Sequence, residues 1–305
     1  MRMNAAGLCL AILAGAGLCA AQTAPAPPLA EPAAVAAEPA AAPAVHQPDY
    51  STVYCAGFVT DQLVPEDMHL ISGEQSTYKI SFTAGDYVYI NRGESQGVKV
   101  GDEFLVLRRT QDPMPVPWFK WQKKLMRAMG TPYEDQGRIQ VVQVKEKISI
   151  AKVIFSCNMM QRGDIIRPFE ARPVPTYKEP AAFDRFAPKS GKEVAMVVTT
   201  SAFQPSAGRN DVVYVNLGSN QGVQVGEYFR VFRYQGTRDE AVPQMENYHF
   251  KLYGFGGTRE EYGPEDLPRE VLGEGIVLNV TRNSSVVLIT VASSEIFNGD
   301  YVEIE

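Results

Sequence analysis

The sequence contains two copies of one segment. Residues 86–108 read DYVYINRGESQGVKVGDEFLVLR and residues 211–233 read DVVYVNLGSNQGVQVGEYFRVFR, which are identical at thirteen of twenty-three positions without a gap. The similarity resumes downstream, where residues 137–164 and 273–300 share apolar alternation, a polar turn, more alternation and a closing Gly-Asp. Self-similarity of this kind indicates internal duplication. The sequence therefore predicts that two copies of one module make up the folded protein.

Each module reads as a series of short strands. Apolar runs rich in β-branched and aromatic residues alternate with Gly turns, and about six such runs per module favour a small closed or partly closed barrel. The predicted fold class is all-β, with two tandem barrel-like modules at residues 50–170 and 191–305, each with an inserted loop or short helix. Residues 54–61 and 193–201 are taken as the opening strands. The Pro-rich residues 171–190 predict an extended linker that couples the modules only loosely.

The repeated glycines predict backbone turns rather than a binding loop. Both copies carry Gly-x-x-Gln-Gly-Val-x-Val-Gly, in which glycine permits the positive φ of tight turns. A phosphate-binding loop would end in Lys-Ser/Thr and lead into a helix, whereas strands follow here. The residues assigned to structural turns are Asn91, Gly93, Gly97, Gly101, Asn216, Gly218, Gly222 and Gly226.

The N-terminal residues 1–21 predict export. Arg2 precedes a run of Ala, Leu, Gly and Ile that ends in small residues, which is the pattern of a cleaved secretory signal peptide. A retained membrane anchor is the alternative, although the run is short and rich in Ala and Gly. Cys19 suggests a lipoprotein, but Leu18 stands where a small residue should precede the cysteine. Residues 22–49, dominated by Ala and Pro, predict a disordered tether.

These features indicate the periplasm or the outer cell surface of a bacterium, where Ala-Pro tethers behind export signals are common. A eukaryotic secreted protein is the alternative, with Asn279 and Asn283 as acceptors for N-glycosylation. The formal net charge of −6 is spread along the chain, and no basic stripe predicts nucleic-acid binding.

Two cysteines follow the signal peptide, Cys55 and Cys157. In an oxidising compartment an even pair is most simply a disulfide. A reactive or metal-binding thiol pair is the alternative, but no Cys-x-x-Cys spacing or nearby histidine supports it. Because Cys55 lies in the first apolar run of module one and Cys157 follows the last, the predicted disulfide would join the two ends of that module.

Each module carries an insertion that holds aromatic residues. In module one, residues 117–127 read PWFKWQKKLMR and combine both tryptophans of the protein with four cations. This segment suits packing on its own barrel, docking on an anionic membrane surface, or binding of a partner or glycan. The aromatic insertion of module two suits contact with a sugar or protein, or a cover over a barrel mouth. The candidate partner-binding residues are Trp118, Phe119, Lys120, Trp121, Lys123, Lys124, Arg127, Tyr248, Phe250, Tyr253 and Phe255.

No residue pattern predicts catalysis or a metal site. His46, His69 and His249 are too scattered for ordinary ligand spacing, and no Ser-His-Asp or Cys-His arrangement can be argued. Acidic pairs such as residues 260–261 lie in polar sequence, where a solvated surface is expected. We therefore expect no enzyme, cofactor, metal or small-molecule substrate. The expected partner is an envelope protein or a peptidoglycan component, with a membrane surface as a further candidate for the Trp/Lys insertion.

The two copies resemble the C-terminal domain of the flagellar assembly protein T family, whose members are periplasmic proteins of the ring around the flagellar basal body. The family's pattern is a strand, an Asn-hydrophobic-Gly turn, a Gln-Gly-Val-x-x-Gly-Asp plug, a Phe-x-Val strand and a hairpin closed by Gly-Asp. Its residues here are Asn91, Gly93, Gln96, Gly97, Val98, Gly101 and Asp102, and Asn216, Gly218, Gln221, Gly222, Val223 and Gly226, with Glu227 in place of the aspartate.

The resemblance implies an envelope β-module used for assembly or binding, and it does not by itself assign a flagellar role. The predicted function is therefore an exported envelope binding or scaffolding protein. The alternative is a peptidoglycan-associated envelope enzyme such as a glycan hydrolase.

Overall fold

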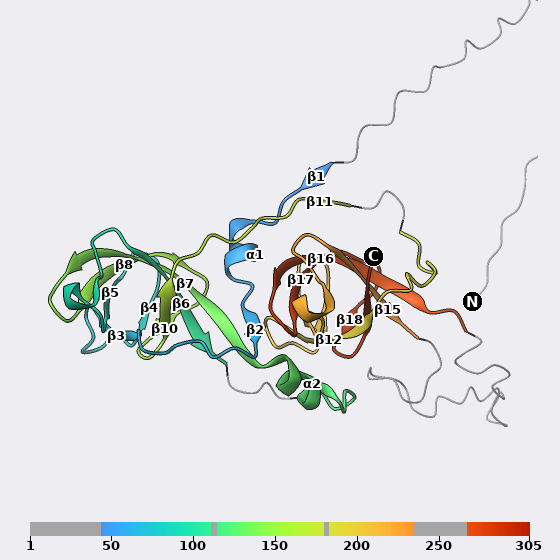
Figure 1. Cartoon of the computed structure of the whole chain (residues 1–305), viewed down its shortest axis with the longest axis horizontal. Helices are drawn as coiled ribbons and strands as arrows, with labels where there is room; N and C mark the ends of the chain where they lie inside the picture. The colour runs from blue at the N-terminus through green and yellow to red at the C-terminus, as the bar shows by residue number, and fades with distance from the viewer. Residues whose placement is uncertain (1–43, 111–114, 180–182, 235–266) are drawn as a thin grey trace, which may run out of the picture. The chain divides into compact units, whose positions relative to one another are not determined.

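The computed structural model describes residues 44–110, 115–179, 183–234 and 267–305, which belong to one compact unit, Pro43–Glu305. The predicted signal peptide and most of the predicted tether lie outside these residues, and so do Tyr248, Phe250, Tyr253 and Phe255 of the second insertion. The described chain is mostly β-structure, as predicted. Module one contains a half-barrel sheet and module two contains a closed six-stranded barrel (Figure 1).

Module one is built on a seven-stranded antiparallel sheet. Its strands are β2 (Phe58–Thr60), β3 (Leu70–Gly73), β5 (Tyr87–Ile90), β6 (Glu103–Arg109), β7 (Thr131–Val144), β8 (Ser149–Ser156) and β10 (Ile165–Pro168). Their order is β10-β6-β7-β8-β5-β3, and β2 pairs with the N-terminal end of β7. Hydrogen bonds from Leu70 N to Asp164 O (2.9 Å) and from Ile166 N to Met68 O (2.8 Å) join the chain around β3 to the start of β10.

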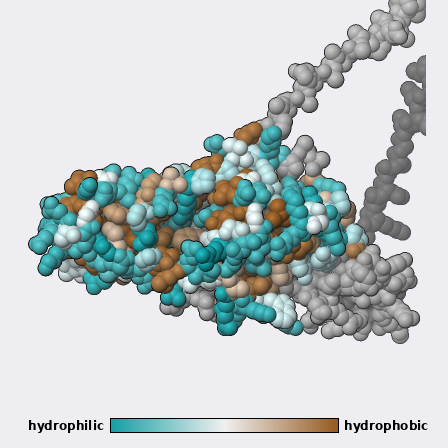
Figure 2. Space-filling view, viewed as in Figure 1, coloured by the Kyte–Doolittle hydropathy of each residue, from teal (hydrophilic) through white to brown (hydrophobic). Residues whose placement is uncertain are grey.

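Module two is a closed barrel. Its strands are β12 (Val194–Thr200), β14 (Val212–Val215), β15 (Tyr228–Arg233), β16 (Glu270–Val280), β17 (Ser285–Ala292) and β19 (Tyr301–Ile304). Their order is β12-β14-β17-β16-β15-β19, and β19 pairs back to β12. Inward side chains such as Val213, Phe229 and Ile289 fill it, as alternate positions of a strand should. On the molecular face drawn in Figure 2, hydrophobic residues are interspersed with hydrophilic ones.

The motif asparagine shows which segments of the two modules correspond. His69 N donates to Asn91 Oδ1 (2.8 Å), and Met196 N donates to Asn216 Oδ1 at the same distance, which makes β3 the counterpart of β12. Residues 54–61 were predicted to open module one as a short strand, and this is confirmed for β2 alone. β2 pairs with β7, however, and it is β3 that takes the place of β12 in module one. Besides β2, which belongs to the seven-stranded sheet, these residues hold the end of a helix. Two of their apolar residues, Ala56 and Val59, are buried in a cluster shared with module two, as shown below.

The repeated Gly-x-x-Gln-Gly motif forms the same turn in both modules. A short 3₁₀ helix, η1 (Glu94–Gln96) or η2 (Ser219–Gln221), follows the first glycine. Gly93 N donates to Gln96 Oε1 at 2.8 Å, and the matching bond in module two is 2.9 Å long. The second glycine of module one, Gly97, has a φ of 83°, in the left-handed region that favours glycine.

We predict that Gly93→Ala destabilises the protein more than Gly97→Ala does. A Cβ at Gly93 would lie 2.2 Å from the backbone oxygen of Lys145, whereas a Cβ at Gly97 meets no atom within 4 Å. Gly97→Ala should lower the free energy of unfolding only by the cost of placing alanine at a positive φ, about 1–2 kcal/mol. The Gly93 change forces two backbone segments apart and should cost roughly 3 kcal/mol. Urea denaturation measures both losses, and equal losses would contradict the importance of the close approach.

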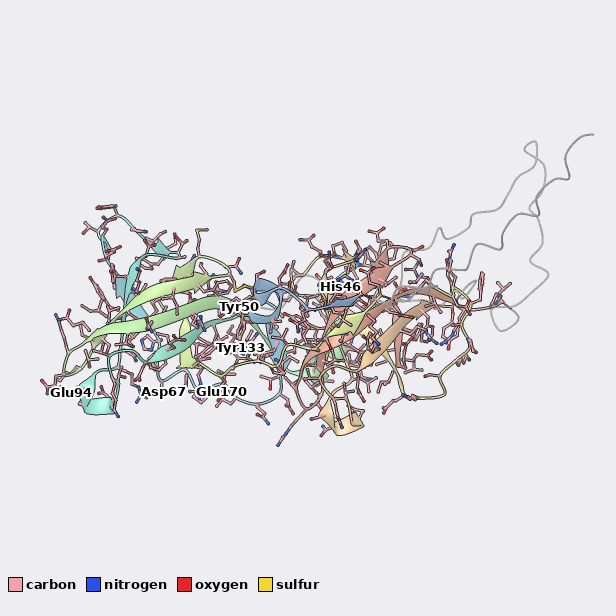
Figure 3. All side chains as sticks on the ribbon, turned by 90° about the horizontal axis from the view of Figure 1, so that it is seen from above. His46, Tyr50, Asp67, Glu94, Tyr133 and Glu170 are labelled. Atoms are coloured by element: carbon pink, nitrogen blue, oxygen red, sulfur yellow. A yellow bond between two sulfur atoms is a disulfide. The ribbon has the colours of Figure 1, made fainter. Side chains whose placement is uncertain are left out.

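The remaining elements in the described ranges are two helices and three short strand pairs. They are α1 (Tyr50–Tyr54), α2 (Gln122–Met129), β1 (Val45–His46) with β11 (Tyr177–Lys178), β4 (Ser81–Phe82) with β9 (Met160–Gln161), and β13 (Ser206–Ala207) with β18 (Ile296–Phe297). The β1–β11 pair, marked by His46 in Figure 3, corrects the prediction of a disordered tether through residue 49. The end of the tether is ordered because it pairs with backbone groups of the linker.

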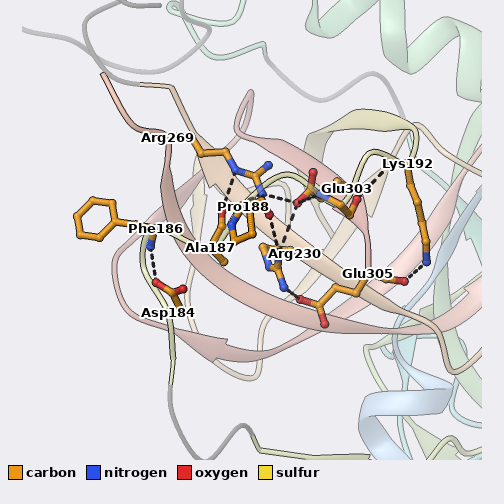
Figure 4. A network of polar contacts seen from close by, with 10 residues as sticks. Asp184, Phe186, Ala187, Pro188, Lys192, Arg230, Arg269, Glu303 and Glu305 are labelled. Carbon is orange, nitrogen blue, oxygen red and sulfur yellow. Dashed lines mark hydrogen bonds and ion pairs between the residues drawn. The ribbon is translucent and has the colours of Figure 1, made fainter. Parts of the chain in front are cut away.

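The C-terminal part of the linker is bound to module two. Arg269 Nη2 donates to Pro188 O (2.7 Å) and to Glu303 Oε1 (2.6 Å), and Arg230 Nη1 donates to Pro188 O (3.3 Å) (Figure 4). Burial alone would raise the pKa of the Glu303 carboxyl, but Arg269, the backbone N–H of Ser190 and the charge of Arg230 together lower that pKa. The linker was expected to be extended and to couple the modules only loosely, but in this segment buried Arg269 and partly buried Arg230 bind its carbonyl groups to module two.

Candidate functional site

The insertion of module one lies against module two. Trp118 Nε1 donates to Asn298 O at 3.2 Å. Gln122 is buried and donates from Nε2 to Val198 O at 2.8 Å. Packing on its own barrel was one expected use of this segment. The structure instead places Trp118 and Gln122 on the neighbouring module.

The insertion around helix α2 has a buried side and an exposed side. On one side, Met126 and Met129 belong to a hydrophobic cluster shared with module two, and Phe119 just before the helix is buried. On the other side the side chains are exposed. This second set, which we call the outer face, consists of Lys120, Trp121, Lys123, Lys124 and Arg127.

The outer face combines four cations with an exposed indole. Trp121 is 59% exposed, and Lys124 Nζ lies 5.9 Å from the centroid of its ring, within the range of a cation–π contact. None of the four cations forms an ion pair with another residue in the described ranges. An unpaired cationic surface with a projecting aromatic ring suits an acidic partner.

The junction between the modules is a shared hydrophobic cluster. Its buried members are Ala56, Val59, Met126 and Met129 of module one and Val198, Val212, Tyr214, Ile276, Leu278, Val286 and Leu288 of module two. Tyr214 donates its hydroxyl to Ala56 O at 2.8 Å. Burial, reinforced by the charge of Asp135, raises the pKa of this hydroxyl, so it remains a donor. Modules that share a core are not loosely coupled, which corrects the expectation drawn from the linker.

The turn between β16 and β17 adds polar contacts to the junction. Thr281 Oγ1 and Ser284 Oγ both donate to Val59 O, at 2.7 and 2.8 Å. Asn283 Nδ2 lies 3.3 Å from Ala128 O, in the last turn of α2, and donates to it. Backbone carbonyls of β2 and α2 are thus satisfied by side chains of module two.

A buried ion pair holds the chain around α1. Asp135 Oδ2 and Oδ1 accept from Arg172 Nη1 and Nη2, both at 2.7 Å, and Oδ2 also accepts from Gly57 N at 2.9 Å. Arg172 further donates to Val53 O at 3.0 Å. Burial alone would lower the pKa of Arg172, but the hydrogen bonds and charge of Asp135 outweigh it and raise that pKa. The pair therefore links the start of the linker to β7 and to the segment that leads into β2.

The structure contains the predicted Cys55–Cys157 disulfide (Figure 3). It joins the residue that ends α1 to the residue that follows β8, with Cα atoms 5.5 Å apart. On α1, the ring of Tyr50 stands edge-on to Phe155, with centroids 5.0 Å apart. Because α1 leads directly into residues 56–60, the disulfide anchors the segment that contacts module two.

Two cavities in the described residues are lined by ionisable groups, and the groups considered below already have partners. The first, about 400 Å³, is lined by residues of module two that include Arg209, Asp211 and Glu295. Its Glu295 accepts from Ser206 Oγ, and its Asp211 accepts from Gly208 N. The second, about 300 Å³, is lined by Cys55, Gly57, Glu134, Asp135, Asn158, Ser201, Ala202, Phe203 and Tyr214. Its aspartate binds the buried arginine, and its tyrosine binds a backbone carbonyl, so neither group is available as a free acid or base.

Within the part of the chain that the structure describes, no group of three or more His, Cys, Asp or Glu side chains is placed to hold a metal ion. His69 Nδ1 lies 3.1 Å from Asn91 Nδ2, His46 lies on β1, and His249 is outside the described residues. Among the described helices, none is both long enough and apolar enough to cross a membrane.

One set of interactions at the repeated positions was missed by sequence reasoning. Arg108 Nε and Nη2 bind the two carboxylate oxygens of Asp164 at 2.7 and 2.8 Å, and Arg233 binds Asp300 in the same way at 2.7 Å. The signal was present, since each arginine closes its copy of the first repeated segment and each aspartate closes the second. The closing Gly-Asp thus locks the module through a bidentate ion pair, besides turning the chain.

Comparison with known proteins does not assign this chain to a family. No protein-family model matches this chain, and no curated protein matches it. The resemblance to the C-terminal domain of flagellar assembly protein T therefore rests on the motif residues alone.

Proposed function

We propose that this chain is an exported bacterial envelope protein that binds or scaffolds another envelope component and performs no catalysis. Its working parts are two β-modules similar to the C-terminal domain of flagellar assembly protein T, held in the periplasm or at the outer cell surface. The signal-peptide pattern and the Ala-Pro tether support this location. The disulfide is compatible with an oxidising compartment.

The observation that carries the proposal is the division of the insertion around α2. Its apolar side packs on module two, so the helix is held in place without a partner. Its outer face keeps four cations and Trp121 exposed. A surface that is already ordered loses little conformational entropy on binding. The partner that complements it is an acidic envelope component, a protein or a peptidoglycan component.

We predict that the double variant Lys123→Glu/Lys124→Glu captures at least about tenfold less partner, because like charges then face an acidic surface. The free energy of unfolding should change by no more than about 0.5 kcal/mol, since both side chains are exposed. The measurement is a quantitative crosslinking pulldown of the tagged protein from its native envelope, with urea denaturation of the purified variants.

The matched control is Lys145→Glu/Lys147→Glu, which changes two exposed lysines in the turn between β7 and β8 by the same charge. This control should capture the same amount of partner as the unaltered protein. Equal capture by the outer-face variant and the control would exclude the outer face as the binding surface.

Incubation with purified peptidoglycan tests the absence of catalysis. The protein is expected to release no soluble fragments. Release that disappears in the variant Glu134→Gln, whose side chain lines the cavity beside the disulfide, would favour a glycan hydrolase over a binding protein.

A further inference from the structure

The four cations of the outer face lie along one line. Their positions follow the spacing i, i+3, i+4 and i+7, which places side chains on one side of a helix. They are Lys120, Lys123, Lys124 and Arg127, and all four are exposed. Lys120 lies in the turn that enters α2, where the N-cap residue Trp121 already has right-handed helical dihedrals. At the rise of an α-helix the line is about 10 Å long. We call it the cationic stripe.

The stability of α2 does not explain the cationic stripe. Lys123 and Lys124 lie in the first turn of the helix, where the partial positive charge of the helix end disfavours cations. That turn contains no acidic residue, and Trp121 makes no side-chain cap hydrogen bond. Among the residues that the structure describes, none forms an ion pair with the stripe. A local rule that is broken without compensation is typical of a functional site.

The outer face is poorly suited to insertion into a bilayer. A helix that lies in a membrane surface buries its apolar side among the lipid chains. The apolar side of α2 is already covered, because Leu125, Met126 and Met129 pack in the cluster shared with module two. Trp121 is the one large apolar side chain between residues 115 and 130 that is exposed. A single ring offers little apolar area to a lipid surface.

The composition of the outer face also differs from that of a protein interface. The cores of protein interfaces are depleted in lysine, and their binding energy comes from aromatic and arginine side chains in pockets that exclude water. Here three of the four cations around Trp121 are lysines. The lysine ammonium is compact and strongly hydrated. It therefore suits an anion that remains in water better than an anion that is buried in a protein contact.

We propose that the outer face binds an anionic glycan, a saccharide chain that carries acidic groups along its length. The proposal rests on the proposed function and names the chemistry of the acidic component. The acidic groups pair with the cationic stripe. A saccharide ring also has a face of C–H groups, which stacks on the exposed indole of Trp121 because the face of an aromatic ring carries negative partial charge. Lys124, 5.9 Å from the centroid of that ring, brings a cation next to the stacking surface.

Calorimetric titration of the full exported chain, with its disulfide intact, tests the proposal. The ligand is a preparation of soluble glycan strands released from purified peptidoglycan with their stem peptides attached. The matched ligand is the same preparation with its carboxylates converted to amides. Amidation should raise the dissociation constant at least about tenfold, because the stripe then has no opposite charge to pair with. Added salt should weaken the binding of the unmodified strands, since exposed charges are screened.

Two single variants test the saccharide part of the proposal. Trp121→Ala should raise the dissociation constant for the strands at least about fivefold, because the stacking surface is lost. The same variant should bind poly-glutamate, which has carboxylates but no sugar, as tightly as the unaltered protein does. The matched control Tyr78→Ala removes an exposed aromatic ring of module one outside the outer face and should bind the strands normally.

Three results would overturn the proposal: strands that do not bind, equal affinity for amidated and unmodified strands, or strand binding that Trp121→Ala leaves unchanged. Tighter binding to poly-glutamate or to vesicles of anionic lipid than to the strands would also overturn it and assign the outer face to a protein or a membrane surface. The proposed function is tested separately, because it fails when the outer-face charge variant and its control capture equal amounts of partner from the envelope.

Discussion

Replacing Asp135 with alanine is expected to lower the free energy of unfolding by about 3–5 kcal/mol, because it leaves a buried guanidinium without its counter-charge. The side chains of Asp135 and Arg172 are only 1% and 13% exposed. Gly57 N loses its acceptor in the same substitution. Urea denaturation at neutral pH measures the loss.

Two further variants separate the causes of this loss. Glu179→Ala removes the ion pair between Glu179 and Arg209, whose side chains are both exposed. It should lower the free energy of unfolding by about 0–1 kcal/mol. Asp135→Leu/Arg172→Met removes both buried charges and should recover much of the stability lost in the single variant. A loss at Asp135 no larger than that at Glu179 would show that the pair is not buried in solution.

The barrel strands could be predicted because their apolar positions repeat in both copies. Residues 87–90 and 212–215 alternate or run apolar with β-branched and aromatic side chains, and the structure has β5 and β14 there. Residues 54–61 could not be assigned in this way. Ala56 and Val59 pack against module two, and a short apolar run in the sequence does not reveal which module it packs against.

The insertion of module one was also only partly predictable from the sequence. Its composition predicted an aromatic and cationic patch, and the cations do lie together on the outer face. Which aromatic rings are buried could not be predicted, because that depends on a contact between Trp118 and Asn298 across 180 positions of sequence.

The motif has aspartate in one copy and glutamate in the other, and both side chains play the same part. Asp102 and Glu227 each accept a hydrogen bond from the backbone N–H three residues earlier, at 2.8 and 2.9 Å.

Removing the disulfide with Cys55→Ala/Cys157→Ala is expected to lower the free energy of unfolding by about 4 kcal/mol. The two cysteines are 102 positions apart. In the chain-entropy model, closing a loop of about 100 residues removes about 4.7 kcal/mol of freedom from the unfolded chain. Thermal and urea denaturation of the oxidised protein and the double variant measure the difference. Ser293→Ala, at the position in module two that corresponds to Cys157, serves as the control and should cost no more than about 1 kcal/mol, since it removes one hydroxyl hydrogen bond.

The effect of removing the disulfide should reach both modules. The disulfide anchors the segment whose Ala56 and Val59 carbonyls accept hydrogen bonds from Tyr214, Thr281 and Ser284 of module two. Freeing that segment should therefore expose the junction, and amide hydrogen exchange should accelerate in β14 and β17 as well as in α1 and β2. Faster exchange confined to module one would mean that each module is stabilised by its own core and that the shared cluster contributes little.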